Sequence, residues 1–370
     1  MSVPQIEIQL VATVVAVACA LPGAFLVLRR MGMMSDAISH AILPGIVVGV
    51  FVVGSLHSPF LIVAAALTGL LTAALVETIN STGQVKEDAA IGLVFPILFS
   101  LGVILIAKFA GDMHLDTDAV LLGELAFAPF NRLTAFGLDL GPQALWTMGG
   151  VLVLNALFLA LFYKELKLAT FDPGLAASLG FRPRILHYAL MGLVSLTAVS
   201  AFDAVGSILV VALMVGPPMT AYLLTDRLEW MIGLSAGFGI LNAIVGYWGA
   251  HVLDVSIAGT MATTTGLVFG VVLLTAPERG LIAQWRRKRR QKWQFAVEML
   301  AIHLRQHENT PEAARECRVD HLQEHLNWDG SFAERVVERA VSRGSVRREN
   351  GHLRLTNEGR EVAQEAATRT

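Results

Sequence analysis

Long apolar runs separated by short polar stretches fill the first three quarters of the chain. Nine runs are long enough, or nearly so, to cross a bilayer as helices, which takes about 20 residues. They are Ile8–Leu28, Ile38–Gly54, Phe60–Ile79, Ala89–Phe109, Gln143–Tyr163, Ile185–Ala201, Val205–Leu224, Glu229–Ala250 and Ile257–Ala276. The second and sixth runs are short, so eight spans remain an alternative if one run is re-entrant. The pattern predicts an all-α polytopic membrane protein with about nine transmembrane helices.

The last quarter of the chain is polar and carries a different pattern. Several segments with helical spacing come first, and then Ser345–Arg348 and His352–Leu355 flank Asn350-Gly351. That arrangement is a strong signal for a β-hairpin. Helices followed by a hairpin are typical of a winged helix. We therefore predict a membrane domain at residues 1–285 and a winged-helix-like α+β domain at residues 286–370.

Composition supports a membrane protein. The 370 residues are 54% hydrophobic and 16% charged, and the mean hydropathy is +0.60. Such values exclude an ordinary soluble protein. The two cysteines, Cys19 and Cys317, lie in different domains, so no disulfide framework is expected. The sequence has no GxxxxGK[ST] phosphate loop, so we do not expect the chain to be an enzyme that hydrolyses a nucleotide.

Positive residues lie next to alternate ends of the predicted spans. They follow the first, third, fifth, seventh and ninth runs, at Arg29, Arg30, Lys86, Lys164, Lys167, Arg182, Arg184, Arg227 and Arg286–Arg290. Lys and Arg are enriched in cytoplasmic loops. The pattern predicts a multi-pass protein of the inner (plasma) membrane, with its amino terminus outside and its C-terminal domain in the cytoplasm.

An acid and an imidazole stand at the start of the second run. Asp36 and His40 are four residues apart and therefore share one face of a helix. A carboxylate beside an imidazole suits a divalent transition metal, and ionisable groups at membrane depth are costly and usually functional. The same spacing also suits an acid that caps a helix and a histidine that packs against a neighbour.

Two loops contain further candidates. The predicted outer loop is acidic, with His114, Asp116, Asp118 and Glu124, and could collect cations; an ordinary solvated loop is the alternative. In the inner loop, Asp172 followed by proline predicts the start of a short helix. An exposed helix there suits docking to another protein, and an unpartnered surface helix is the alternative.

Two histidine pairs in the C-terminal domain have helical spacing. His303 and His307 are four residues apart, as are His321 and His325. Both pairs could bind a metal. Solvated helix faces explain the spacing more simply, and we favour that interpretation.

Four segments resemble a known family in the same order. They are RRMGMMSDAISHAILPG, KEDAAIGLVFPILFSLGVILI, FDPGLAASLGF and VGSILVVALMVGPPMTAYLL. They resemble permeases of the zinc, manganese and iron class of ABC importers, over residues 10–277. The resemblance implies the type II importer fold, a homo- or heterodimer of permease subunits, two cytoplasmic ATP-binding subunits and an extracytoplasmic metal-binding protein. It places metal coordination on Asp36 and His40. It places the ATPase-coupling helix on Asp172, Ala176, Ala177 and Gly180.

These observations predict a permease that imports Mn²⁺ or Zn²⁺, with Fe²⁺ as a further candidate, and that has no permanently bound cofactor. The C-terminal domain resembles the winged-helix part of iron-dependent repressors. A membrane-tethered, metal-responsive DNA-binding regulator is therefore an alternative, and an ATP-independent carrier is a third. Lys and Arg only modestly outnumber Asp and Glu in the C-terminal domain, which argues against DNA as a partner because DNA binding needs several phosphate contacts.

Overall fold

The computed structural model describes residues 2–53, 59–109, 125–135, 138–349 and 351–368. Contacts divide the chain into two compact units, Met1–Gly280 and Leu281–Thr370. The division lies slightly before the predicted boundary at residue 285. In the described ranges, nine helical segments are long and apolar enough to cross a membrane, which confirms the predicted count.

The bounds of the spans agree with the apolar runs to within a few residues. In chain order they are α1 (Val3–Leu28), α2 with α3 (Met33–Ala41 and Leu43–Val53), α4 (Pro59–Asn80), α5 (Glu87–Phe109), α7 (Gln143–Leu161), α10 (Pro183–Val205), α11 (Ser207–Leu224), α12 (Leu228–Leu253) and α13 (Ile257–Thr275). The second and sixth spans are 21 and 23 residues long. The prediction that they are short was wrong, and the eight-span alternative loses its basis.

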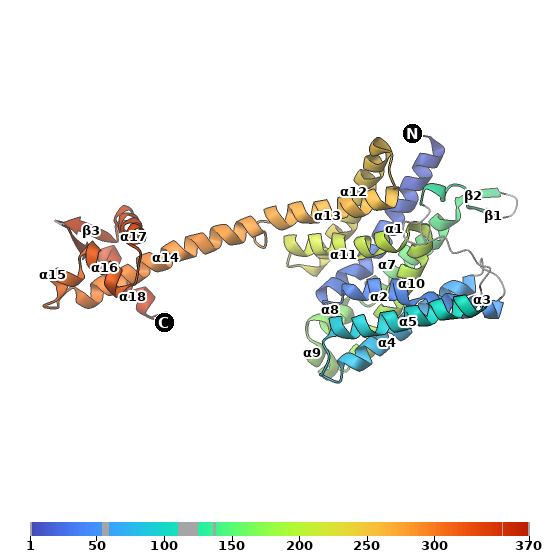
Figure 1. Cartoon of the computed structure of the whole chain (residues 1–370), viewed down its shortest axis with the longest axis horizontal. Helices are drawn as coiled ribbons and strands as arrows, with labels where there is room; N and C mark the ends of the chain where they lie inside the picture. Colours follow the sequence, from blue (N-terminus) through green and yellow to red (C-terminus); the bar gives the residue numbers. More distant parts are fainter. Residues whose placement is uncertain (1, 54–58, 110–124, 136–137, 350, 369–370) are drawn as a thin grey trace. The chain divides into compact units, whose positions relative to one another are not determined.

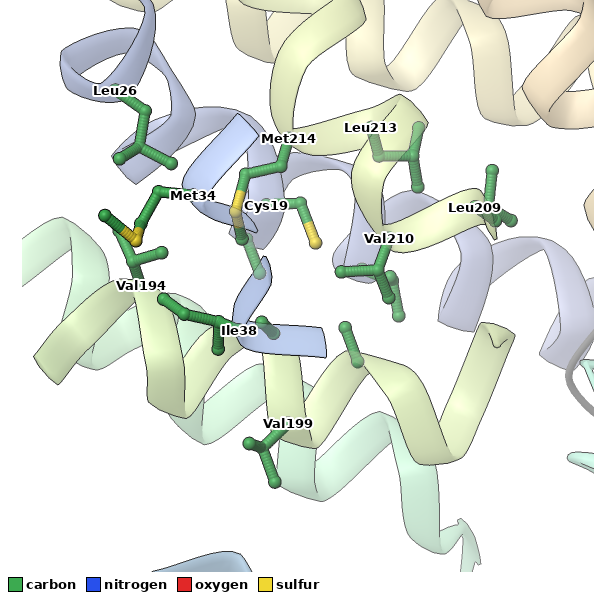
Figure 2. Close-up of a cluster of buried hydrophobic side chains, with 14 of the residues drawn as sticks. Cys19, Leu26, Met34, Ile38, Val194, Val199, Leu209, Val210, Leu213 and Met214 are labelled. Carbon is green, nitrogen blue, oxygen red and sulfur yellow. The ribbon is translucent and has the colours of Figure 1, made fainter. Parts of the chain in front are cut away.

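Helix α1 lies at the centre of the first unit and packs against α7, α10, α11 and α12. One cluster of buried side chains joins it to α2, α10 and α11. Figure 2 shows that cluster, with Cys19, Leu26, Met34, Ile38, Val194, Val199, Leu209, Val210, Leu213 and Met214. Burial of this apolar surface within the chain fixes the position of the short helix α2, as described below.

Small residues allow two of the spans to approach closely. A Cβ added at Gly69 of α4 would lie 2.0 Å from the Oγ atom of Ser195 in α10. The Ser195 hydroxyl donates a hydrogen bond to the Ala66 carbonyl oxygen at 2.9 Å. The close contact of α4 and α10 therefore requires a residue without a side chain at position 69.

The outer connection between α10 and α11 is shorter than predicted. We expected a loop at Phe202–Ala204, but α10 continues to Val205 and only Gly206 separates it from α11. Gly206 has φ of +79°, a conformation that glycine adopts readily. A glycine at this position makes the tight helical hairpin feasible.

Short elements complete the first unit. They are η1 (Leu125–Phe127), β1 (Arg132–Ala135), β2 (Leu138–Pro142), α8 (Tyr163–Phe171) and α9 (Pro173–Ser178). Strands β1 and β2 pair in antiparallel fashion. Arg132 lies 3.2 Å from Glu7 of α1 and 2.5 Å from Asp139 of β2, so ion pairs connect this hairpin to the start of the chain.

The second unit has a core of its own. Its elements are α14 (Leu281–His307), α15 (Ala313–Glu316), α16 (Val319–His325), α17 (Gly330–Ser342), β3 (Val346–Glu349), β4 (His352–Leu355) and α18 (Asn357–Thr368) (Figure 1). The pairing of β3 with β4 confirms the predicted hairpin, although Asn350 lies outside the described residues. Leu300, Leu304, Val336 and Leu353 belong to one buried cluster. The winged-helix classification of this unit stays a prediction.

Candidate functional site

The second span consists of two helices rather than one. Helix α2 ends at Ala41 and α3 begins at Leu43, with Ile42 between them. Pro44 explains the break, because proline has no N–H group to donate to the carbonyl oxygen of His40, one turn earlier. Interrupted helices are tolerated at membrane depth where they are buried in protein or line a cavity, and in transporters they form ion sites.

One face of α2 anchors it in the core. Met34, Ala37, Ile38 and Ala41 are buried, and α2 packs against α4, α5, α10 and α11. Figure 2 shows Met34 and Ile38 among the side chains of that core. Residues two positions away on a helix point to the opposite side. The anchored face therefore directs Asp36 and His40 away from the core.

Asp36 and His40 lie side by side, as their spacing predicts. The Nε2 atom of His40 is 3.5 Å from the Oδ1 atom of Asp36. Within the single chain, the side chain of His40 is 34% exposed and that of Asp36 is 37% exposed. Two adjacent ligand atoms of different types, accessible from outside the subunit, are what a transiently bound cation requires.

Aromatic rings of α5 border the histidine. The His40 ring centroid lies 6.0 Å from that of Phe95 and 6.4 Å from that of Phe99. These rings limit the space into which the imidazole can turn and keep water from one side of it. A polar interaction beside such apolar walls is stronger than it would be in water.

Gly45, just after the break, allows α3 to contact α4. We expect Gly45→Ala to destabilise the folded protein by about 1–3 kcal/mol, as overpacking does. A Cβ there would lie 2.1 Å from Thr68 Oγ1 and 2.8 Å from the carbonyl oxygen of Ala64. Thermal unfolding in detergent measures the effect. Gly92→Ala in α5 is the matched control, since nothing lies within 4 Å of its added Cβ; equal changes in Tm for both variants would contradict the contact.

The short helix α9 forms as the inner-loop sequence predicts. The Oδ1 atom of Asp172 accepts a hydrogen bond from the Leu175 N–H at 2.8 Å, which caps the helix. Gly180 has φ of +87° and follows the last turn, where glycine commonly ends a helix. Ala177 is exposed, but Ala176 is fully buried, so Ala176 packs inward instead of offering a docking surface.

Three large apolar side chains, which we name the α9 stripe, are exposed around this helix. They are Phe171, Leu175 and Leu179. Leu175 belongs to α9, whereas Phe171 is the last residue of α8 and Leu179 directly follows the end of α9, so the three side chains surround the short helix instead of forming one helix face. An exposed apolar stripe on an end of the protein where Lys and Arg are frequent is a surface that suits a protein partner.

A partly buried polar network, which sequence reasoning missed, connects the residues before α9 to the end of α1. Arg29 donates a hydrogen bond from Nε to Thr170 Oγ1 at 3.2 Å, and its Nη1 lies 3.2 Å from Nδ1 of His187 in α10. The other ring nitrogen of His187 lies 3.5 Å from Glu77 Oε2 in α4. Two charged or ionisable groups inside predicted spans, Glu77 and His187, were the signal that could have revealed this network.

The site residues predicted from the sequence fall into two groups, those that the structure describes and those that it does not. The structure brings Asp36 and His40 together on α2 and places Asp172 and Gly180 at the two ends of α9. His114, Asp116, Asp118 and Glu124 lie outside the described residues, so the outer cation path stays a prediction.

Apolar spans, one of them interrupted beside an acid and an imidazole, define a polytopic membrane permease. A comparison with family models supports this class. The model described as "ABC 3 transport family" matches residues 6–276. The chain belongs to the ABC 3 transport family.

Individual relatives agree with the family. The chain is 48% identical over 358 residues to the "Zinc transport system membrane protein TroD" of Treponema pallidum. The matched region covers 97% of this chain and 97% of that one. It is 49% identical over 270 residues to the "Manganese transport system membrane protein MntD" of Bacillus subtilis, covering 73% of this chain and 91% of that one. Among solved structures, "PsaBC from Streptococcus pneumoniae in complex with Fab" matches with a TM-score of 0.60 and 31% identity, over 74% of this chain and 92% of that chain.

Proposed function

We propose that the chain is the permease subunit of an ABC importer for a divalent transition metal, with Mn²⁺ and Zn²⁺ as the principal candidates and Fe²⁺ as a third. The observation that carries the proposal is the Asp36–His40 pair on the interrupted second span. One carboxylate and one imidazole suit both manganese and zinc. The names of TroD and MntD support the same two ions.

A second permease subunit, identical or related to this chain, completes the passage for the metal ion. Asp36 and His40 are partly exposed in the single chain at membrane depth, and contact of such groups with lipid is costly. Cover by a second subunit removes that cost and places the two pairs around a shared passage. The PsaBC structure, whose name joins two components, supports a partner of some kind.

Two cytoplasmic ATP-binding subunits drive the cycle. This chain has no phosphate-loop motif of its own. The α9 stripe suits insertion into an apolar groove of such a subunit, with Asp172, Ala177 and Gly180 shaping the docking helix. A few residues near the centre of an interface often carry most of its binding free energy.

The partly buried polar network provides a physical route from the docking helix to the metal pair. Thr170 lies directly before Phe171 of the α9 stripe. Arg29 ends α1 and lies shortly before α2, which carries Asp36 and His40. The hydrogen bond between Thr170 and Arg29 connects the segment before α9 to the segment before α2. Movement of α9 on ATP binding would therefore act on the start of α2.

The positions of Lys and Arg support an inner-membrane protein with α9 and the C-terminal unit in the cytoplasm. The opposite side then receives the ion from an extracytoplasmic metal-binding protein. The acidic segment with His114, Asp116, Asp118 and Glu124 belongs to that side and would attract the cation on arrival.

The structure gives the DNA-binding alternative little support. In the hairpin of the second unit, Arg348 lies 2.5 Å from Glu334, while Arg347 and Arg354 lie 4.0 and 3.7 Å from Glu349. Carboxylates beside these arginines offset the positive charge that phosphate contacts need. We therefore assign the C-terminal unit to the transporter and not to gene regulation.

Uptake in a strain that lacks its own manganese and zinc importers tests the proposed function. The chain is expressed with its ATP-binding subunit and binding protein, and cellular manganese, zinc and iron are measured. We expect accumulation of at least one of these ions, and loss of that accumulation when the ATP-binding subunit is omitted. An assembled complex that accumulates none of the three ions would contradict the proposal.

A further inference from the structure

Four metal-ligating side chains meet inside the C-terminal unit. His303 and His307 lie on one face of α14, and their ring centroids are 4.8 Å apart. Glu316 at the end of α15 and His321 of α16 approach the same place: the Nε2 atom of His321 is 2.9 Å from Glu316 Oε1. The Nε2 atom of His303 is 4.0 Å from Glu316 Oε2. The cluster therefore joins three helices.

The burial of these residues overturns the interpretation of His303 and His307 as a solvated face. The His303, Glu316 and His321 side chains are 6%, 8% and 12% exposed, and His307 is half-buried. His303 lies between Leu300 and Leu304, which are core residues of this unit. Charged groups are rarely buried unless they are paired or bind a metal. The side chain of His325 lies outside the described residues.

The geometry fits a first-row divalent cation. One ligand atom each from His303, His307 and Glu316 lie within 4.8 Å of one another. In a tetrahedral zinc site, ligand atoms about 2.1 Å from the ion are about 3.4 Å apart. Side-chain adjustments of about 1 Å therefore suffice to close the site, and the half-buried His307 has room to make them.

Second contacts orient two of the three ligands, His303 and Glu316. The Nε2 atom of His303 lies 3.1 Å from the carbonyl oxygen of Glu316. His321 contacts one carboxylate oxygen of Glu316, while the other oxygen faces His303. Metal ligands are commonly held in this way by neighbouring polar groups.

We propose that the C-terminal unit contains a second metal site, in which His303, His307 and Glu316 bind a zinc-class divalent cation and His321 positions Glu316. Two imidazoles and a carboxylate form a known zinc ligand set. The general order of affinities for divalent metals favours Zn²⁺ over Mn²⁺ at such a site. Bound metal would fasten α14, α15 and α16 together and stabilise the unit. The proposal does not depend on transport.

Zinc binding to the full chain tests the site. The protein carries Asp36→Ala and His40→Ala, which remove the proposed transport pair, and is purified in detergent through a tag without histidine. Equilibrium dialysis against Zn²⁺ with a competing chelator, followed by elemental analysis, measures stoichiometry and affinity. We expect one Zn²⁺ per chain, with weaker binding of Mn²⁺, and an increase in the unfolding temperature of the C-terminal unit on zinc addition.

Further variants assign the ligands. On the same background, His307→Gln and Glu316→Gln should remove the bound zinc, and His321→Gln should weaken it by about 10- to 100-fold. His352→Gln, a histidine of the same unit outside the cluster, should change nothing. Circular dichroism verifies folding of each variant, and the absorption spectrum of bound Co²⁺ reports histidine ligation independently of stability. Absence of bound zinc in the background protein, or full zinc retention in folded His307→Gln and Glu316→Gln proteins, would overturn the proposal.

Discussion

Replacing Asp36 or His40 with alanine is expected to abolish metal uptake while the permease still assembles. The two side chains are adjacent, and in the proposed site they belong to a small set of metal ligands. Loss of an orienting group near a metal already costs about 10- to 100-fold in affinity, so loss of a direct ligand should reduce uptake by more than about 100-fold. Uptake of radiolabelled Mn²⁺ or Zn²⁺ into cells or vesicles measures the effect.

The control for these variants lies on the same helix. Ser39→Ala removes a hydroxyl whose 2.8 Å hydrogen bond goes to the Ser35 carbonyl within α2. Because this hydroxyl is buried and already hydrogen-bonded within α2, whereas Asp36 and His40 are partly exposed, uptake should stay near that of the unchanged protein. Normal uptake by both Asp36→Ala and His40→Ala would end the assignment of the site.

Replacing Leu175 with aspartate is expected to separate the permease from its ATP-binding subunits. Leu175 is the central member of the exposed α9 stripe. A carboxylate placed in an apolar groove loses hydration without gaining a partner, and we expect the cost to reach that of an interface hot spot, about 2 kcal/mol or more. Co-purification should fall by at least roughly 30-fold, and ATP-dependent uptake should be lost with it.

An exposed apolar residue outside the stripe provides the comparison. Val255 is exposed and follows the end of α12, at the opposite end of that helix from Arg227, which we predict to be cytoplasmic. Val255→Asp introduces the same charge at the opposite end of the protein and should leave co-purification unchanged. Stoichiometric retention of the ATP-binding subunits by the Leu175→Asp protein would show that α9 is not their docking site.

The spans could be predicted because length and hydropathy alone define them. A helix needs about 20 apolar residues to cross a bilayer, and such runs are visible in one sequence. The cap of α9 could also be predicted, because it depends only on neighbouring residues: Asp172 accepts a hydrogen bond from an N–H group three residues away. The sixth span was underestimated because Phe202 to Val205 includes an acid, Asp203, which interrupts the apolar run but not the helix.

Contacts between distant residues could not be predicted. Arg29 meets Thr170 and His187 across separations of 141 and 158 residues, and no local pattern specifies which helices become neighbours. The burial of His303 had the same cause, because its spacing suits a solvated face and a core equally well. The packing of α15, α17, α18 and β4 against α14 distinguishes the two.

A structure of the assembled permease dimer with Zn²⁺ or Mn²⁺ bound tests the central claim most directly. We expect the ion between the two subunits, with Asp36 and His40 side-chain atoms about 2.0–2.2 Å from Zn²⁺. An ion held elsewhere along the passage, with Asp36 and His40 turned toward lipid, would contradict the claim that this pair carries the metal across the membrane.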